Sequence, residues 1–294
     1  MDKEVEEKYI KAGKAAADVR EASRSIVEVG KKLIDIAEEI EALIRSKGAE
    51  PAFPVNISIN DVAAHYTPTK NEEAVVKEND MVKIDIGVHV DGYIGDTAVT
   101  INFNKDYDDL VRAAETALQE ALKIIAPDAL LSDVSSVIEE AITNFGFKPV
   151  SNLTGHGLNK YDLHTEPTVP NVSFKSDYRL KENQVIAIEP FATDGAGYVK
   201  DSESVFIFSL LEKKPVRNPD ARKIIEFAES RNGLPFAERW VPIDSLFKIR
   251  IALREMRERG ILHDFNVLKE VNSGMVSQAE HTLIVRDLPI ILTK

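Results

Sequence analysis

The chain has no cysteine among its 294 residues. That absence excludes disulfides, thiolate nucleophiles and metal sites built on thiolates. Any bound metal ion must therefore be held by carboxylates, imidazoles or carbonyl groups.

Long apolar runs are also missing, since none approaches the roughly 20 residues that a membrane-spanning helix needs. The stretch MDKEVEEKYIKAG at the start is charged and acidic. It has neither the apolar core of a signal peptide nor the arginine-rich character of a transit peptide. We therefore expect a cytoplasmic protein with no membrane partner.

Basic residues are the minority, because 37 Lys and Arg stand against 49 Asp and Glu, for a net charge of −12. Nucleic acid is not expected as the primary ligand, since binding phosphates needs a basic surface. One basic stretch, FKIRIALREMRERG at 247–260, is interpreted as a solvated helix face.

Two segments, 25–48 and 130–146, carry apolar residues at helical spacing and end at a glycine. They match when the sequence is shifted by 98 positions. The matching pairs are Leu33/Leu131, Asp35/Asp133, Ile40/Ile138, Glu41/Glu139, Ile44/Ile142, Gly48/Gly146 and Pro51/Pro149.

A second match follows in the same order, because VKENDMVKID (76–85) resembles LKENQVIAIE (180–189). Asp85 then corresponds to Glu189, and His65 lies 99 positions before His164. A period of about 100 residues is too long for a solenoid. It predicts two similar α+β halves that face each other, each supplying an acid at a strand end and a histidine in a preceding loop.

The stretch KIDIGVHVDGYIGD (83–96) has the pattern of two strands joined by a tight turn at Asp91-Gly92. This turn would place Asp85 and Asp96 on one face as diagonal neighbours. Two bare carboxylates so close together repel, unless one is protonated or a cation is bound.

The neighbours of these acids are small, with Gly87 opposite Asp96 and Ala98 opposite Asp85. They would leave room for ions. A solvent-exposed face is the alternative explanation, although Lys, Thr or Glu would then be expected beside the acids. The hairpin alone leaves both interpretations open.

Three further candidates are His156 between glycines in TGHGL, interpreted as a loop, Glu189 at the end of the apolar run IAIEPF, and Glu280 in SQAEHTLIV. Each has an ordinary structural explanation on its own. Together with the hairpin they supply four acids and one histidine. Such a set suits two divalent ions about 3.5–4 Å apart, and it favours Mn, Fe, Co or Zn.

The composition of the chain changes at about 209–272. This segment is charged, rich in helix formers and interrupted by prolines. The repeat has no counterpart for this stretch, so we interpret it as a helical insertion. GMVSQAEHTLIVRD (274–287) then returns to strand character.

At this point the sequence resembles the type II methionine aminopeptidases, above all their short archaeal form. The motifs that carry the resemblance span the chain: AFPVNISINDVAAHYTP (52–68), KIDIGVHVDGYIGD (83–96), GHGLNKYDLH (155–164), AIEPFATDGAGYV (187–199) and SQAEHT (277–282). The resemblance implies a single pita-bread domain over 1–294, with the insertion at about 209–272 as the mark of type II. Two pseudo-symmetric halves would surround a central antiparallel sheet.

The resemblance also implies the residues of the site. Two divalent ions would be bridged by Asp96 and Glu280, with Asp85 on one ion and with His156 and Glu189 on the other. The remaining implied residues are the two histidines outside the ligand set, His65 and His164, and four that line the pocket for the substrate side chain, Phe53, Leu163, Phe191 and Phe265.

The implied activity is removal of the N-terminal methionine from peptides and nascent chains with a small second residue, by a metal-activated water. Catalysis would use His65, His164 and Glu189. Two alternatives stay open: a proline-specific peptidase of the same fold, and a binding protein without catalysis. A monomer is expected, and contact with the ribosome is open. One departure from relatives is HTEPTVPN (164–171), where Glu166 would change the rim or add charge near the cleft.

Overall fold

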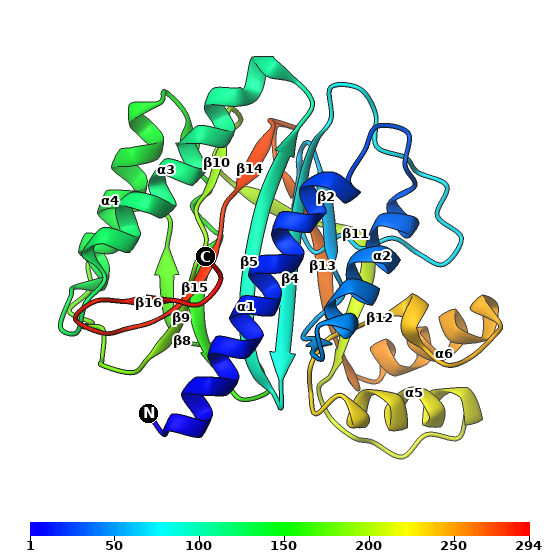
Figure 1. The fold of residues 1–294 in the computed structure, drawn as a ribbon. Coiled ribbons are helices and arrows are strands. Elements are labelled where there is room, and N and C mark those ends of the chain that lie inside the picture. The colour runs from blue at the N-terminus through cyan, green and yellow to red at the C-terminus, as the bar shows by residue number, and fades with distance from the viewer.

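The computed structural model describes residues 1–294 and has the predicted α+β fold, with helices outside and strands through the middle (Figure 1). No helix combines the length and the apolar character that crossing a membrane would require. The α-helices are α1 (Lys3–Ile26), α2 (Leu33–Ser46), α3 (Asp108–Ile124), α4 (Leu131–Asn144), α5 (Pro219–Ser230) and α6 (Leu246–Glu258).

The strands form four small sheets in which all pairings are antiparallel. In the first, β4 (Met81–Val90) pairs with β5 (Tyr93–Asn102) on one edge and with β1 (Glu50–Pro51) and β2 (Asn56–Ile59) on the other. In the second the order is β16 (Ile290–Ile291), β15 (His281–Ile284), β9 (Val185–Ile188), β7 (Thr154–Asn159) and β8 (Asp162–Pro170).

Two further sheets complete the fold. The third has the order β14 (Val276–Gln278), β10 (Phe191–Thr193) and β6 (Lys148–Pro149). The fourth has the order β12 (Phe236–Ala237), β11 (Val199–Leu210), β13 (Leu262–Glu270) and β3 (Val62–Ala64).

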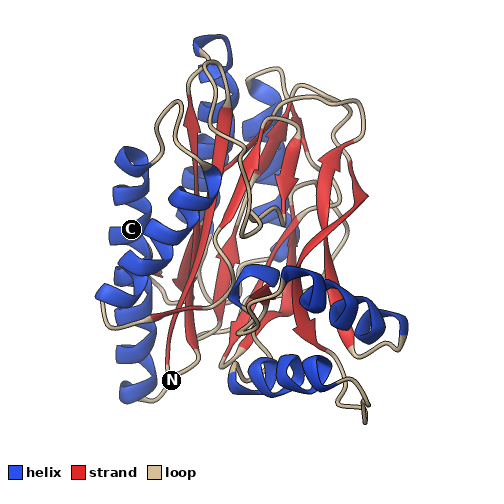
Figure 2. Cartoon of the chain, turned by 90° about the vertical axis from the view of Figure 1, so that its right-hand side faces the viewer, coloured by secondary structure: helices blue, strands red, loops and turns tan.

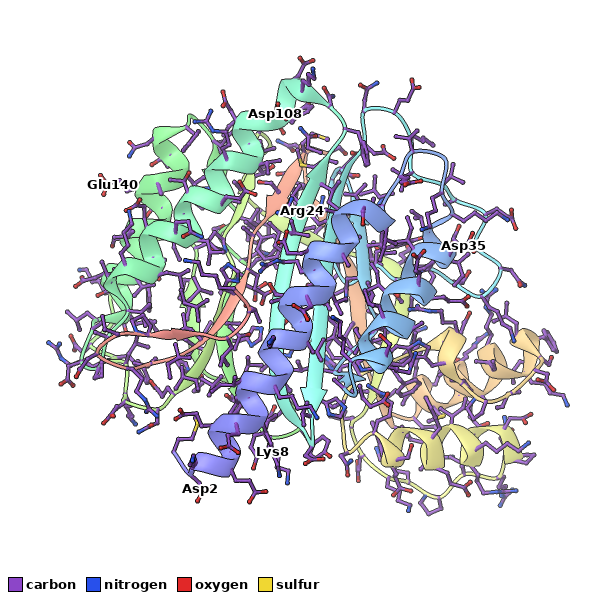
Figure 3. All side chains as sticks on the ribbon, viewed as in Figure 1. Asp2, Lys8, Arg24, Asp35, Asp108 and Glu140 are labelled. Carbon is purple, nitrogen blue, oxygen red and sulfur yellow. The ribbon has the colours of Figure 1, made fainter.

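Each half buries the apolar faces of its helices against its own strands. In the first half Ile36, Ile40 and Ile44 of α2 join Ile84 and Ile86 of β4 in one fully buried cluster. Turned by 90°, the helices still lie around the strands (Figure 2). Charged side chains occupy the opposite helix faces and point to solvent, as for Arg24, Asp35, Asp108 and Glu140 (Figure 3). This is the arrangement expected of amphipathic helices.

The predicted repeat is present in the structure. Helices α2 and α4 both have 14 residues, and each is preceded by an isolated bridge at an equivalent position, Lys32–Val75 and Leu130–Arg179. Asn79 and Asn183, also equivalent, both take the left-handed backbone conformation with φ of 71°. The chain therefore follows the same path twice, as two pseudo-symmetric halves.

The hairpin register is as predicted: Asp85 pairs with Ala98 and Gly87 with Asp96 across β4 and β5. Asp91 and Gly92 both have positive φ, at 52° and 89°, as the tight hairpin turn requires. A slip of one residue would separate the two acids onto opposite faces, so this turn fixes their proximity.

One helix prediction is wrong at its beginning, because residues 27–32 form a loop and α2 begins only at Leu33. Val27 takes an extended conformation at the end of α1 and Gly30 has φ of 86°. The loop is held instead by the next segment, since Gly30 donates to the Val76 carbonyl at 2.7 Å and Leu33 to the Ala74 carbonyl at 3.0 Å.

The segment predicted as a helical insertion is helical only in part. Helices α5 and α6 lie within it, but Leu262–Glu270 is strand β13, so helix is the wrong prediction there. This strand lies between β11 and β3 and bonds to both. Neighbours on both sides satisfy its backbone, which the local composition alone does not reveal.

Candidate metal centre

Asp85 and Asp96 line a cavity of about 220 Å³. Asp96 is 4% exposed, and Thr282 holds its backbone, accepting from its N–H and donating to its carbonyl at 2.8 Å each. Asp85 stands in the middle of β4, so the prediction of an acid at a strand end is wrong for it.

The second half contributes His156, Glu189 and Glu280 to the same cavity. His156 lies in strand β7 and pairs with Ala187, so the predicted loop is wrong. Glu189 directly follows β9, at the strand end as predicted. Glu280 lies between β14 and β15, and its carbonyl accepts from the Thr97 hydroxyl of β5 at 2.8 Å. That bond joins the two halves at the cavity.

Polar atoms of the five residues converge. His156 Nε2 lies 3.4 Å from Glu189 Oε1 and 3.9 Å from Asp96 Oδ2. Asp96, His156 and Glu280 each offer a ligand atom within 4.8 Å of the others. The structure thus brings all five predicted metal-ligand candidates to one place.

The buried carboxylates of this cluster would be stabilised in their ionised form by a nearby positive charge. Burial raises the pKa of Asp85 to about 7, and burial with mutual repulsion raises the pKa of Asp96, Glu189 and Glu280 well above their usual range. No Lys or Arg lines the cavity. Buried oxygens of Asp85, Asp96 and Glu280 have no hydrogen-bond partner.

Divalent ions fit this set of donors. Burial lowers the pKa of His156 to about 3, so its ring is neutral, as a metal ligand must be. Four carboxylates with a neutral imidazole form a hard, oxygen-rich set that suits first-row divalent metals. Bound cations would compensate the carboxylate charges that burial now disfavours.

His65 and His164 line the same cavity, with Phe265 near both rings. His65 follows β3 with φ of 64°, and its Nδ1 lies 3.1 Å from the Asn266 carbonyl. Burial lowers its pKa to about 4.

His164 lies in strand β8, so its predicted position in a loop is wrong. The centroid of its ring lies 4.6 Å from that of His156. Its side chain remains open to solvent at the cavity mouth, although the surrounding protein lowers its pKa by partial desolvation.

The four predicted pocket residues also line the cavity, and Phe53, Leu163 and Phe191 are buried. Phe265 comes from strand β13. The suggestion that Gly87 makes room for ions is wrong, because a Cβ at that position would overlap the ring of Phe53. The missing side chain makes room for the pocket wall instead.

Other residues of the cavity were not predicted. Among them are Asn56, Asn152, Ile207 and Pro235. The alternation of polar and apolar residues in VNISI, which puts Asn56 and Ser58 on one face, was the one available signal for Asn56. Glu166, in contrast, is exposed and lines a separate cavity with Lys160 and Lys181, so it adds no charge to this one.

Arg239 and Trp240 hold the chain that follows His65, one of the cavity residues. Arg239 forms a buried ion pair with Glu41 of α2, and its guanidinium also donates to Thr67 Oγ1 at 2.6 Å and to the Pro68 carbonyl at 3.1 Å. Trp240 donates to the same Glu41 at 2.8 Å. These bonds fix the chain directly after His65.

Comparison with known proteins agrees with this geometry. A model of metallopeptidase family M24 matches residues 7–217. The methionine aminopeptidase of Methanocaldococcus jannaschii is 43% identical over 294 residues, covering 100% of this chain and 99% of the relative. That of Archaeoglobus fulgidus is 46% identical over 289 residues, covering 98% and 97%.

Solved structures share the fold. Methionine aminopeptidase from Thermotoga maritima superposes with a TM-score of 0.73 at 24% identity, covering 100% of this chain and 98% of that chain. A thermophilic Arx1 gives 0.84 at 18% identity, covering 98% and 90%. Prolidase from Pyrococcus furiosus gives 0.65 at 18%, but this chain covers only 64% of it.

Fold and site together define a pita-bread protein with a cluster of carboxylates and histidine suited to divalent metal ions. The chain belongs to metallopeptidase family M24.

Proposed function

We propose that this protein is a methionine aminopeptidase that removes the N-terminal methionine from peptides and nascent proteins with a small second residue. The observation that carries the proposal is a single cavity in which four carboxylates and three histidines meet an apolar wall. Relatives named methionine aminopeptidase, alike over the whole chain, support it.

Two divalent ions, Co, Mn, Fe or Zn, would be held by the five clustered residues. In this proposal Asp85, Asp96 and Glu280 would act as carboxylate ligands, and His156 and Glu189 would complete the set. When bound, such ions lower the pKa of a water to near neutrality and polarise the scissile carbonyl.

Glu189 is the proton carrier in this proposal. Its side chain touches His156 at 3.4 Å and accepts from Gln278 at 3.4 Å through its second oxygen. A carboxylate beside the attacking water can take up its proton and pass it to the leaving amine. The Gln278 contact keeps the carboxylate oriented for that transfer.

The two histidines act on the substrate as neutral groups. If His65 Nδ1–H donates to the Asn266 carbonyl, its Nε2 is free to accept from the N–H of the scissile amide or the leaving amine. His164, at the mouth, donates to the oxyanion that forms at the scissile carbonyl. The role of His65 as an acceptor needs an uncharged ring, which its lowered pKa supports. The pKa of His164 is lowered as well, and a neutral ring still donates through one N–H.

The apolar wall would select the methionine side chain. Phe53, Leu163, Phe191 and Phe265 are among the residues that line the cavity of about 220 Å³. One methylene in such a pocket discriminates by only about 1–3 kcal/mol, so a close fit around the thioether is needed.

We further propose that the protein works as a monomer in the cytoplasm and touches the ribosome through α6. Phe247 and Ile251, one turn apart on α6, are 74% and 48% exposed, and the side chain of Arg254 beside them is 80% exposed. A basic and apolar face is unusual on a chain with net charge −12. Ribosome co-sedimentation should weaken in Phe247→Ala combined with Arg254→Glu, and unchanged sedimentation would refute this contact.

The function is tested by metal analysis and peptide hydrolysis together. Protein loaded with Mn²⁺ or Co²⁺ should release methionine from Met-Gly peptides and leave X-Pro dipeptides intact. Glu189→Gln should retain the fold and lose methionine release. Cleavage of X-Pro dipeptides would favour the proline-specific alternative, and a folded protein that binds no metal and cleaves neither substrate would favour a binding protein.

A further inference from the structure

Asn56 is a cavity residue to which the reaction above gives no role. It lies on β2 directly opposite Asp85 on β4. Side chains of paired residues lie on the same face of a sheet, and both line the cavity. Asn56 is 4% exposed.

The amide of Asn56 is satisfied at one end only. Its Nδ2 donates to the Pro54 carbonyl at 2.9 Å, which fixes the orientation of the amide. Its Oδ1 is buried and has no partner, and the same is true of Asp85 Oδ1 on the facing strand. An unpaired buried acceptor costs about 1–3 kcal/mol, so the arrangement favours a donor that enters from the cavity.

Asn152, which lines the same cavity, makes the contrast clear. Its Nδ2 donates to the Val199 carbonyl at 2.8 Å, and its Oδ1 accepts from the Val199 N–H at 2.9 Å. Both ends of that amide are used by the backbone. Of the two amide side chains that line the cavity, only Asn56 keeps an unpaired acceptor.

We propose that Asn56 Oδ1 accepts a hydrogen bond from the free α-amine of the substrate's first residue. This inference rests on the proposed function. A methionyl peptide offers two kinds of donor near the scissile bond, the α-amine and the scissile amide. In the proposed mechanism the N–H of the scissile amide donates to His65, and the thioether side chain has no donor.

A neutral acceptor suits this position better than another acid would. Four carboxylates already line this cavity, and like charges so close together repel one another. Asn56 adds an oxygen that can accept a hydrogen bond from an N–H without adding a fifth negative charge. Peptides with a blocked amino end have no free amine to offer, so Asn56 would contribute to the requirement for a free N-terminus.

The test compares how the loss of the Asn56 amide changes the affinity for a ligand with an amine and for a ligand without one. Mn²⁺-loaded protein is titrated calorimetrically with L-methionine and with 4-(methylthio)butanoate, which has the same side chain and carboxylate but no amine. Asn56→Ala should lose about tenfold in affinity for methionine, as expected when a hydrogen bond worth about 1.4 kcal/mol is removed. Its affinity for the deaminated compound should change less than twofold.

Asn56→Leu, which keeps the bulk and removes the acceptor, should show the same pattern. Asn152→Ala is the matched control and should change the affinity for both ligands by the same factor. Mn²⁺ affinity without ligand should stay within twofold in the Asn56 variants.

An equal loss of affinity for both ligands, or no loss of affinity, would overturn the proposal. A large fall in Mn²⁺ affinity would also overturn it, since Asn56 would then act on the metal. These outcomes differ from failure of the proposed function. In that case the unaltered protein would release no methionine from Met-Gly peptides and would not prefer methionine over the deaminated compound.

Discussion

The ring of Phe53 lies against the backbone of Gly87, so closely that a Cβ at position 87 would overlap three of its ring atoms. Gly87 is also the residue paired with Asp96 in the hairpin. Gly87 therefore contacts both parts of the cavity. It pairs with an acid of the cluster, and its lack of a side chain leaves the space that the Phe53 ring occupies.

Gly87→Ala should therefore displace Phe53 and narrow the methionine pocket. Overpacking of this kind costs about 1–3 kcal/mol, and we expect KM for Met-Gly peptides to rise at least about fivefold. The double variant with Phe53→Leu should recover part of the loss, because the smaller side chain frees the space. Steady-state kinetics measure both effects, and an unchanged KM in the single variant would contradict the arrangement.

His164→Ala should lower kcat by about 100-fold or more, the usual cost of removing an oxyanion donor. Methionine binding should change less than about threefold, because the role is confined to the transition state. His263→Ala is the control, since His263 packs on Phe265 at 4.7 Å but does not line the cavity. A loss of kcat below tenfold in His164→Ala would remove the histidine from this role.

The four clustered acids should destabilise the metal-free protein as pH rises from about 4 to above 7. Burial raises the folded-state pKa of Asp85 to about 7, and the other three acids shift in the same direction. These acids bind more protons in the folded than in the unfolded state over this range, so their contribution to stability is lost as they ionise. The buried histidines, whose pKa is lowered, contribute in the opposite direction. Relative to Asp96→Asn, which keeps the histidines, the unaltered metal-free protein should lose at least about 3 °C more in Tm from pH 5.5 to pH 7.5, roughly 1 kcal/mol for a domain of this size.

Added Mn²⁺ should reverse the trend at pH 7.5, because the ion binds the ionised carboxylates of the folded state only. Asp96→Asn removes one charge from the cluster and keeps the histidines, so it isolates the contribution of the acids. An equal change in Tm with pH in Asp96→Asn and in the unaltered metal-free protein would show that these acids do not repel one another.

Arg239→Met should destabilise the protein by about 3–5 kcal/mol, because Glu41 would keep a buried charge without its partner. The side chains of this pair are only 2% and 4% exposed. Changing both residues together to Met should recover much of the loss in denaturant unfolding. Arg254→Met, in an exposed pair with Glu258, should cost about 1 kcal/mol or less, and a similar cost at position 239 would argue against a buried brace.

Local patterns predicted much of the fold because they depend on short-range chemistry. The turn at Asp91-Gly92 determined the register of β4 and β5, and the shifted matches revealed the two halves. The patterns failed where tertiary contacts decide. Residues 27–32 have helical spacing, but their backbone bonds to residues 74–76, and β13 is a strand because β11 and β3 lie on either side of it.

The sequence by itself determined which chemistry is available: oxygen and nitrogen ligands without thiols, and two acids on one face of a hairpin. Only the tertiary structure decided how these groups meet. His156 and Asp96 are 60 positions apart, yet they lie 3.9 Å from each other, because packing of the two halves joins strands from each. It also decided that Gly87 makes room for Phe53 and that Asn56 faces the acids, since both depend on which strand lies next to β4.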